Sequence, residues 1–193
     1  MEKKQKLLLH SCCAPCSSYV ISFLKNDYDI TVLFYNPNIT DKNEYEKRKN
    51  EQMKLLSILD IDFFENENPC DGEYNSDLFY NQIKGLENEK EGGERCVKCF
   101  ALRLHKSAET AKQNKYDVFA TTLSVSPHKN AKTINEIGNS IEKELNIKYL
   151  EADFKKNDGY KKSIELSKKY DLYRQNYCGC IYSMRNSERG IRN

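Results

Sequence analysis

Seven of the eight cysteines in this sequence fall into three compact groups. The groups are Cys12, Cys13 and Cys16; Cys96 and Cys99; and Cys178 and Cys180. Spacings of one, two or three positions let successive thiolates turn toward one centre from a loop or a helix start, as coordination of iron or zinc requires. The remaining cysteine, Cys70, stands alone beside Pro69, and we expect it to be a small apolar filler. The pattern predicts one metal or redox site built from three distant segments.

The number of cysteines bears on which metal the site would hold. A cubane iron–sulfur cluster takes four thiolates, so the seven grouped cysteines would leave three for a second metal with an open side. Soft thiolates also suit zinc and copper, so sulfur ligands alone do not select the metal. A zinc ribbon would explain two C-x-x-C pairs but not the Cys178-Gly179-Cys180 spacing. A thioredoxin-like dithiol at Cys96 and Cys99 would leave the other grouped cysteines unexplained.

The pattern of apolar residues predicts the elements that position these groups. Short apolar stretches typical of buried parallel strands span residues 6–10, 30–35, 61–64, 118–125 and 148–152. Helical periodicity follows at residues 45–59 and 134–145, and further helices are expected at 78–86, at 100–111 and after 158. This alternation predicts a single-domain, Rossmann-like α/β sandwich over residues 1–193, with about five parallel strands and helices on both faces of the sheet.

Three of the predicted strands run directly into candidate functional segments. These segments are residues 10–16, 36–39 and 124–128. In open parallel sheets, ligands bind beyond the carboxyl ends of the strands, because loops and helix amino termini converge there. We also expect Cys96 to open a helix, whose positive amino end would favour thiolates. The metal site is therefore predicted at this edge of the sheet, and the polar stretch 87–94 is predicted to be an exposed loop.

The composition excludes several classes of protein. Charged residues make up 31% and hydrophobic residues 38%, a balance that is unlike disordered or membrane-embedded chains. The formal net charge of +2 is small for a nucleic-acid binder, so any RNA contact has to come from local basic patches. No apolar stretch approaches the roughly 18 residues of a spanning helix, and we expect a cytoplasmic protein. In that reducing compartment, many cysteines indicate metal or redox chemistry before structural disulfides.

Five segments, in order along the chain, together resemble the QueH family. They are HSCCAPCSSY at residues 10–19, FYNPNI at 34–39, ERCVKCFALRL at 94–104, TTLSVSPHKN at 121–130 and YRQNYCGCIYS at 173–183. The resemblance covers most of the chain and implies an adenine-nucleotide-hydrolase-like α/β fold. It also implies a reductase of epoxyqueuosine already installed in tRNA, with a [4Fe-4S] cluster beside a separately ligated iron. Carried over position by position, the family's metal ligands fall on Cys12, Cys13, Cys16, Cys96, Cys99, Cys178 and Cys180.

The implied reaction is the last step of tRNA queuosine biosynthesis, at the wobble position. Converting the epoxide to an alkene consumes two electrons and two protons and releases water, and an open iron would bind the epoxide oxygen as a Lewis acid. The sequence has no Gly-x-Gly-x-x-Gly fingerprint, so we expect electrons to come singly from an external ferredoxin or flavodoxin. His10, Tyr35 and His128 lie at or near strand ends and are candidate proton donors.

The implied partner is a tRNA anticodon stem-loop whose wobble base is splayed into the metal pocket, because single-stranded loops unstack at little cost. The candidates to stack on bases are Tyr19, Tyr160, Tyr173, Tyr177 and Tyr182, although tyrosines at helical spacing more often pack in the core or its rim. The candidates either to hold phosphates or to order the cysteine loops are Arg103, Arg174 and Arg185.

Two other functions remain as alternatives. An ATP-pyrophosphatase-like tRNA-modifying enzyme would use a similar sheet, but residues 11–18 contain no glycine that would let the backbone approach pyrophosphate closely. An iron–sulfur electron-transfer or cluster-carrier protein would need the cysteines alone. Release of AMP would indicate the first alternative, and cluster transfer without change to the tRNA would indicate the second.

Overall fold

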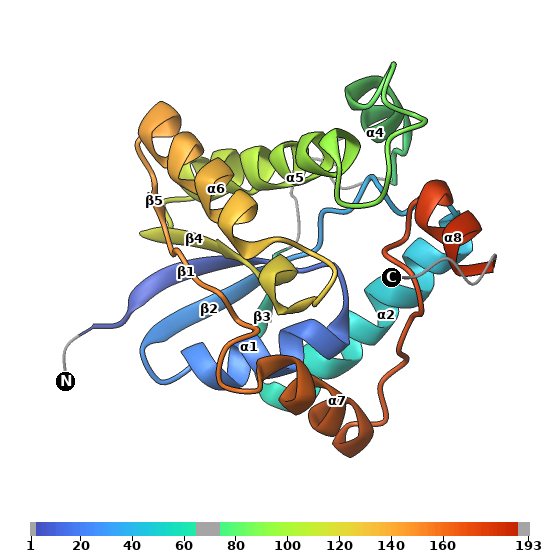
Figure 1. Cartoon of the computed structure of the whole chain (residues 1–193). Helices are drawn as coiled ribbons and strands as arrows, with labels where there is room; N and C mark the ends of the chain where they lie inside the picture. The colour runs from blue at the N-terminus through green and yellow to red at the C-terminus, as the bar shows by residue number, and fades with distance from the viewer. Residues whose placement is uncertain (1–2, 65–73, 189–193) are drawn as a thin grey trace.

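We describe a computed structural model of the protein over residues 3–64 and 74–188. The isolated Cys70 lies outside the described residues, so its predicted role as an apolar filler stays a prediction. Within the described part of the chain, strands and helices alternate from β1 to α8, and the core consists of a sheet with helices packed against it (Figure 1).

A five-stranded parallel sheet forms the centre of the fold. Its order is β3 (Asp62–Phe63), β2 (Tyr28–Leu33), β1 (Gln5–His10), β4 (Val118–Thr121) and β5 (Lys148–Tyr149). The register pairs Leu9 of β1 with Val32 of β2 and with Ala120 of β4, and every pairing is parallel. All five strands therefore end at one edge, as the sequence predicts, and the segments that follow β1, β2 and β4 meet there.

The fourth strand is shorter than its apolar pattern predicts. The pattern suggested a strand over residues 118–125, but β4 ends at Thr121 and continues as a 3-10 turn, η1 (Thr122–Val125). The Thr121 hydroxyl oxygen accepts a hydrogen bond from the backbone N–H of Leu123 at 3.2 Å, which turns the chain away from the sheet. This turn directs residues 126–129 toward the sheet edge that carries the cysteines.

Helices cover both faces of the sheet, as predicted. Side chains alternate between the faces, so Leu8 points to one layer whereas Leu7 and Leu9 point to the other. The Leu8 layer packs under α5 (Glu94–Gln113) and α6 (Ala131–Leu145). The opposite layer packs against α1 (Ala14–Leu24), α2 (Lys42–Leu59) and α7 (Gly159–Lys169), on the other side of the sheet in Figure 1.

Two short helices and one early helix start complete the described fold. The short helices are α4 (Asp77–Gln82) and α8 (Ile181–Glu188). Helix α5 begins at Glu94, earlier than the predicted residue 100, because Gly93 provides an extended N-cap and the first turn is polar. Both Cys96 and Cys99 consequently lie in the first two turns of a helix, as predicted. None of the described helices is long and apolar enough to cross a membrane.

Candidate metal centre

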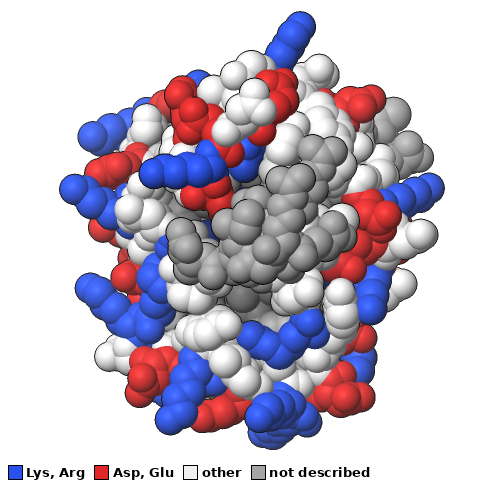
Figure 2. All heavy atoms as spheres, turned by 45° about the vertical axis from the view of Figure 1, so that its right-hand side comes forward, with Lys and Arg blue, Asp and Glu red and all other residues white. Residues whose placement is uncertain are grey.

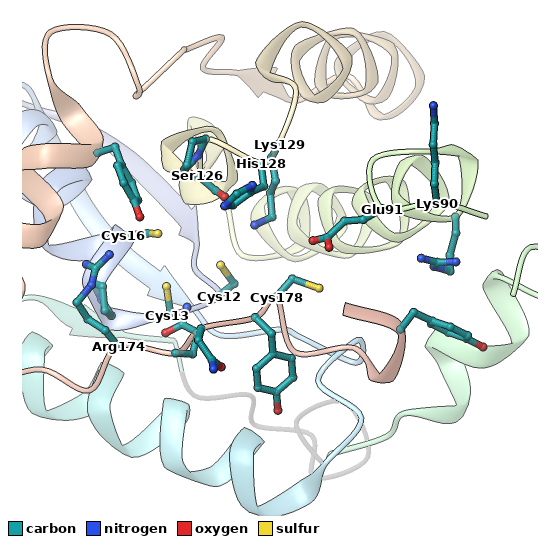
Figure 3. A pocket seen from close by; sticks show the side chains of 18 of the residues that line it. Cys12, Cys13, Cys16, Lys90, Glu91, Ser126, His128, Lys129, Arg174 and Cys178 are labelled. Carbon is teal, nitrogen blue, oxygen red and sulfur yellow. The ribbon is translucent and has the colours of Figure 1, made fainter. Parts of the chain in front are cut away.

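The structure brings the three cysteine groups together at the carboxyl edge of the sheet. Cys12 and Cys13 follow β1, the second group opens α5, and the third immediately precedes α8. All seven grouped cysteines are free thiols. Figure 3 shows Cys12, Cys13, Cys16 and Cys178 around one cavity, although their elements are far apart in the sequence. The predicted convergence of distant sulfur-bearing segments is therefore seen in the fold.

The thiols face two adjacent cavities. A large cavity of about 730 Å³ is lined by Cys12, Cys13, Cys16 and Cys178 together with loop residues. A narrow cavity of about 30 Å³ is lined by Cys96, Cys99, Cys178 and Cys180. Because Cys178 lines both, the four-thiol set and the Cys12–Cys16 set adjoin each other. We call these sets the inner thiols (Cys96, Cys99, Cys178, Cys180) and the outer thiols (Cys12, Cys13, Cys16).

Regular structure positions the outer thiols. Cys13 is the N-cap residue of α1, with an extended backbone and Pro15 in the first turn, so Cys16 lies one turn further on the same helix. Beneath the loop, the Ser11 and Ser17 hydroxyls both donate to Gln52 Oε1 of α2, at 2.8 and 3.0 Å. Strand, helix cap and buried polar contacts thus fix one short loop, and all of these residues are close to the thiols in sequence except Gln52.

The loop of Cys178 and Cys180 is held by contacts with the start of α2 and the segment before it. Arg48 is 1% exposed, and its guanidinium donates to the carbonyl oxygens of Cys178 at 3.1 Å and Tyr177 at 3.2 Å. The Arg48 Nε atom also pairs with Glu44 at 2.7 Å. Gly179 adopts φ +116°, which an L side chain rarely adopts. A buried arginine and a glycine therefore fix this loop.

The second group depends on α5 itself. The Gly92 N–H donates to Cys96 Sγ at 3.3 Å, and Arg103 Nε donates to the Cys99 carbonyl oxygen at 3.3 Å. Arg103 is 2% exposed and lines the narrow cavity beside the inner thiols. The structure thus favours the prediction that Arg103 orders a cysteine segment over the prediction that it holds an exposed phosphate.

Burial and close neighbours control the protonation of the thiols. Burial raises the pKa of the Cys99 thiol to about 11. Cys178 Sγ and Cys180 Sγ lie 3.4 Å apart. The hydrogen bond between them lowers the pKa of Cys178 and raises the pKa of Cys180, because a proton on one sulfur stabilises a thiolate on the other. A metal that displaces the remaining protons would bind more tightly as pH rises.

Two cationic side chains adjoin the sulfur atoms. Arg103 lies among the inner thiols, and Lys129 lines both cavities. Burial opposes the charged form of Lys129, but the nearby sulfurs of Cys12 and Cys178 outweigh it and raise the Lys129 pKa above its ordinary value. In Figure 3 the Lys129 side chain extends into the cavity near these sulfurs. The site therefore carries fixed positive charge that favours thiolates and anionic ligands.

The three candidate proton donors occupy different environments. His10 is fully buried, with Nε2 3.1 Å from the Tyr35 carbonyl oxygen and Nδ1 2.9 Å from Thr121 Oγ1. A carbonyl can only accept, so Nε2 carries the proton and the Thr121 hydroxyl donates to Nδ1. Burial, followed by the charge of Arg103, lowers the His10 pKa to about 3. This geometry supports a structural role for a neutral His10.

Tyr35 and His128, the other two candidate donors, also occupy different environments. The Tyr35 side chain is partly buried and packs against the core beneath α5 and α6. His128, by contrast, lines both cavities, and its ring appears beside Lys129 in Figure 3. Among the three predicted donors, His128 is therefore the one that the structure places on a cavity wall. The catalytic roles of all three stay predictions.

Loop residues form the outer walls of the large cavity. The predicted exposed loop supplies one wall, with Glu87, Lys90 and Glu91 among its residues, and the segment before Cys178 supplies another. The candidate base-stacking residues Tyr160, Tyr177 and Tyr182 all line this cavity, as does Arg174. On the face shown in Figure 2, basic and acidic side chains alternate without forming one large basic patch, in keeping with the small net charge.

Sequence reasoning missed Arg48, Gln52 and Lys129. Arg48 and Gln52 lie on the buried face of α2 with Tyr45 and Leu55, so polar residues at helical spacing within an apolar stripe were the available signal. That signal shows burial but does not reveal the partner, because the loop of Cys178 lies 130 positions from Arg48. For Lys129, the only signal was its place within the segment after β4.

Comparisons with known proteins agree with the geometry. The family model described as "Epoxyqueuosine reductase QueH" matches residues 7–186. A protein of that name from Streptococcus pyogenes is 43% identical over 93% of this chain and 71% of its own length. Its namesake from Thermotoga maritima is 35% identical over 92% of this chain and 90% of its own length.

A solved structure shares the fold. The U34-tRNA thiolase NcsA from Methanococcus maripaludis, solved with its [4Fe-4S] cluster, superposes with a TM-score of 0.57 over 98% of this chain and 65% of its own. At 13% identity, this likeness concerns the α/β architecture alone. The family model and the relatives, in contrast, match nearly the whole chain at 35–43% identity. The chain belongs to the epoxyqueuosine reductase QueH family.

Proposed function

We propose that this protein reduces epoxyqueuosine in tRNA to queuosine, by removing the epoxide oxygen as water with two electrons and two protons. Membership of the QueH family supports the reaction. The observation that carries the proposal is the convergence of three segments of free thiols beside a cavity of about 730 Å³. The volume of this cavity lies within the range of about 300–1,000 Å³ that is typical of small-molecule sites, so it has room for a splayed, modified nucleotide.

The inner thiols are the proposed ligands of a [4Fe-4S] cluster. Four cysteines are the ligand set of such a cluster, and Cys96, Cys99, Cys178 and Cys180 line one common cavity as free thiols. Four thiolates would also suit a single zinc ion, so the donor set alone does not select the cluster. The proposed reduction needs a redox-active metal, which zinc is not, and this favours the cluster.

The outer thiols are the proposed ligands of a second, separately bound iron. Cys12, Cys13 and Cys16 line the large cavity and adjoin the inner thiols through Cys178. Three thiolates would leave coordination positions for a ligand that enters from the cavity. When bound, the two iron centres would supply electrons and a Lewis acid for the epoxide oxygen.

The side chains around the cavity have separate proposed roles. His128 stands on the wall and would deliver a proton to the leaving oxygen, whereas Lys129 would hold developing negative charge. Tyr160 and Tyr177 would stack on the splayed base or its neighbours. Arg174 donates to the Ser163 carbonyl oxygen at 3.4 Å and lies 5.9 Å from the Tyr160 ring, so its charge is already oriented on the rim for phosphate.

Electrons are proposed to arrive singly from an external ferredoxin or flavodoxin, and the reaction is proposed to take place in the cytoplasm at the wobble nucleotide of the anticodon loop. The absence of a dinucleotide fingerprint in the sequence supports an external donor. A single compact unit over residues 1–193 is proposed to carry all of these parts.

The test is anaerobic reconstitution followed by iron and sulfide counting and turnover of epoxyqueuosine-containing tRNA. We expect about five irons and four sulfides per chain, with formation of queuosine. Cys99→Ala should remove the sulfide of the cluster, whereas Cys16→Ala should remove about one iron per chain and leave the sulfide in place. Metal-loaded protein that never changes the tRNA, but passes its cluster to an acceptor, would indicate a carrier. ATP-dependent release of AMP would indicate the pyrophosphatase alternative.

A matched pair of variants tests the proton donor. His128→Asn should lower turnover by about 100-fold while iron content stays unchanged, since general acids commonly contribute that much. His105→Asn is the control, because the half-buried His105 of α5 contacts Glu109 of the same helix and Glu144 of α6 and lines neither of the two cavities described above. Unchanged turnover in His128→Asn would remove His128 from the mechanism without affecting the assignment of the metal ligands.

A further inference from the structure

The turn between β2 and α2 contacts the backbone of both thiol sets. Asn36 Nδ2 donates to the Ser11 carbonyl oxygen at 2.8 Å, directly before Cys12. Asn38 Nδ2 donates to the Cys178 carbonyl oxygen at 3.5 Å, and Asn38 also lines the narrow cavity. The first contact reaches the outer thiols, and the second reaches an inner thiol. Two asparagines separated by one proline therefore touch both halves of the proposed metal centre.

Backbone hydrogen bonds constrain this turn and add a second contact with the loop of the inner thiols Cys178 and Cys180. The Ile39 N–H donates to the Asn36 carbonyl oxygen at 3.1 Å, which closes the turn. The Thr40 N–H donates to the Gly179 carbonyl oxygen, also at 3.1 Å. Pro37 fixes one backbone dihedral between the two asparagines. The distance between the Asn36 and Asn38 amides is therefore set by a short, constrained segment.

Both asparagine side chains are buried, and Asn38 is a poor choice for stability alone. Each is 1% exposed. Asn36 shares a hydrogen bond with the His10 side chain, whereas Asn38 leaves its Oδ1 atom without a hydrogen-bond partner. An unpaired buried acceptor costs about 1–3 kcal/mol, which offsets the gain from the single bond that the Asn38 amide makes. What each amide does provide is a directed donor to a carbonyl oxygen next to a thiol.

We propose that residues 36–40 form a clamp that sets the spacing between the outer and inner thiols. Asn36 positions Cys12 through Ser11, and Asn38 with Thr40 positions Cys178 and Gly179. The inference rests on the proposed function in so far as these thiols hold metals. Because the large cavity receives thiols from both sets, their spacing would determine whether the open metal and its electron source reach the same substrate.

The clamp predicts opposite metal losses for two similar variants. Asn36→Ala should lower iron from about five to about four per chain and leave sulfide near four, because only the outer thiols lose their support. Asn38→Ala should release sulfide to a chelator about tenfold faster and change the electron paramagnetic resonance spectrum of the reduced cluster, because removing outer-shell support typically weakens metal binding by 10–100-fold.

Asn139→Ala serves as the matched control. It removes an amide that donates to Glu151 at 2.8 Å on the exposed surface of α6, and it should leave both metals in place. Equal loss of both metals in Asn36→Ala and Asn38→Ala, or no loss in either, would overturn the clamp. Neither measurement uses tRNA. A loaded protein that leaves epoxyqueuosine unchanged refutes the proposed function, whereas the clamp is decided by iron, sulfide and the spectrum.

A second variant covers the case in which Asn38→Ala does not fold. Asn38→Leu keeps the volume of the side chain and removes both its unpaired oxygen and the amide that donates to the Cys178 carbonyl oxygen, which still accepts from Arg48. Circular dichroism checks the fold, and faster loss of sulfide with retention of the outer iron would support the clamp. Retention of both metals with an unchanged spectrum would contradict it.

Discussion

The outer thiols and the loop of Cys178 meet at the same cavity, yet they are positioned by different means. The outer thiols lie between β1 and α1, where a strand, an N-cap and a helical turn place them within five residues. Cys178 and Cys180 precede the short helix α8 and are held by α2 and the turn before it. One half of the centre follows from local structure, and the other follows from contacts across about 130 residues.

This difference teaches where the centre is most easily broken. The outer loop has several supports, including the parallel register of β1 and the contact of Gln52 with two serines. The inner loop depends on contacts from Arg48, Asn38 and Thr40 and on a glycine with positive φ. Substitutions in the inner loop should therefore cost metal, whereas loss of the Gln52 contact beneath the outer loop should cost mainly folding stability.

The largest effect is expected from Gly179→Ala. A Cβ atom there would lie 2.8 Å from Ile39 Cγ1 and 3.3 Å from Arg48 Nη1, in addition to the strain of φ +116°. We expect the loop to shift and the cluster to be retained at least about tenfold less well, measured as sulfide per chain after exposure to a chelator. The Cys12–Cys16 iron should be affected less.

Gly85→Ala is the control for this glycine. Gly85 also has positive φ, +85°, but a Cβ atom there meets nothing within 4 Å. It should cost about 1–2 kcal/mol of backbone strain and no metal. If both variants lose the cluster to the same extent, backbone strain explains the loss and the close packing against Arg48 does not.

The fold could be predicted from the sequence because its signals are local. Each strand bears an apolar run of its own, and amphipathic spacing marks α2 and α6 without knowledge of their partners. The errors have local causes as well. The Thr121 side chain ended β4 early, and the polar first turn of α5 concealed the true start at Glu94.

The site could be predicted only in part. The cysteine spacing identified all three groups, because thiols that act together cluster in sequence on each segment. It did not identify Arg48 or the partner of Gly179, since these contacts join segments that only the folded chain brings together. It also gave His10, Tyr35 and His128 equal standing, whereas the structure distinguishes a buried imidazole from one on the cavity wall.

The next largest effect is the dependence of folding stability on pH through His10, which ends β1 just before the outer thiols. The His10 pKa is about 3 in the folded protein against 6.5 in the unfolded chain, so the unfolded chain binds the proton more readily. This contribution to stability is complete above pH 6.5 and is lost progressively as pH falls toward 3. Between pH 6.5 and 5 the loss should be about 2 kcal/mol.

Urea unfolding of the metal-free protein at several pH values measures this loss. His10→Gln removes the titrating ring, so its free energy of unfolding should fall less steeply over the same interval, whatever its absolute stability. The His105→Asn variant is the control, since that histidine is half-buried between α5 and α6, away from the strand ends. Parallel pH profiles for the native protein and His10→Gln would show that His10 does not contribute to the pH dependence of the free energy of unfolding.

The smallest effect is expected from Gln52→Met, which probes how redundant the outer supports are. The change removes the acceptor of Ser11 and Ser17, but the two hydroxyls still contact each other, and Ser17 can then donate to the Cys13 carbonyl oxygen, which lies 3.1 Å away. It also removes a buried Nε2 atom that has no partner. The free energy of unfolding should fall by about 1 kcal/mol or less in urea, with iron content unchanged. Loss of the outer iron would show that this loop, like the inner one, depends on contacts from distant parts of the chain.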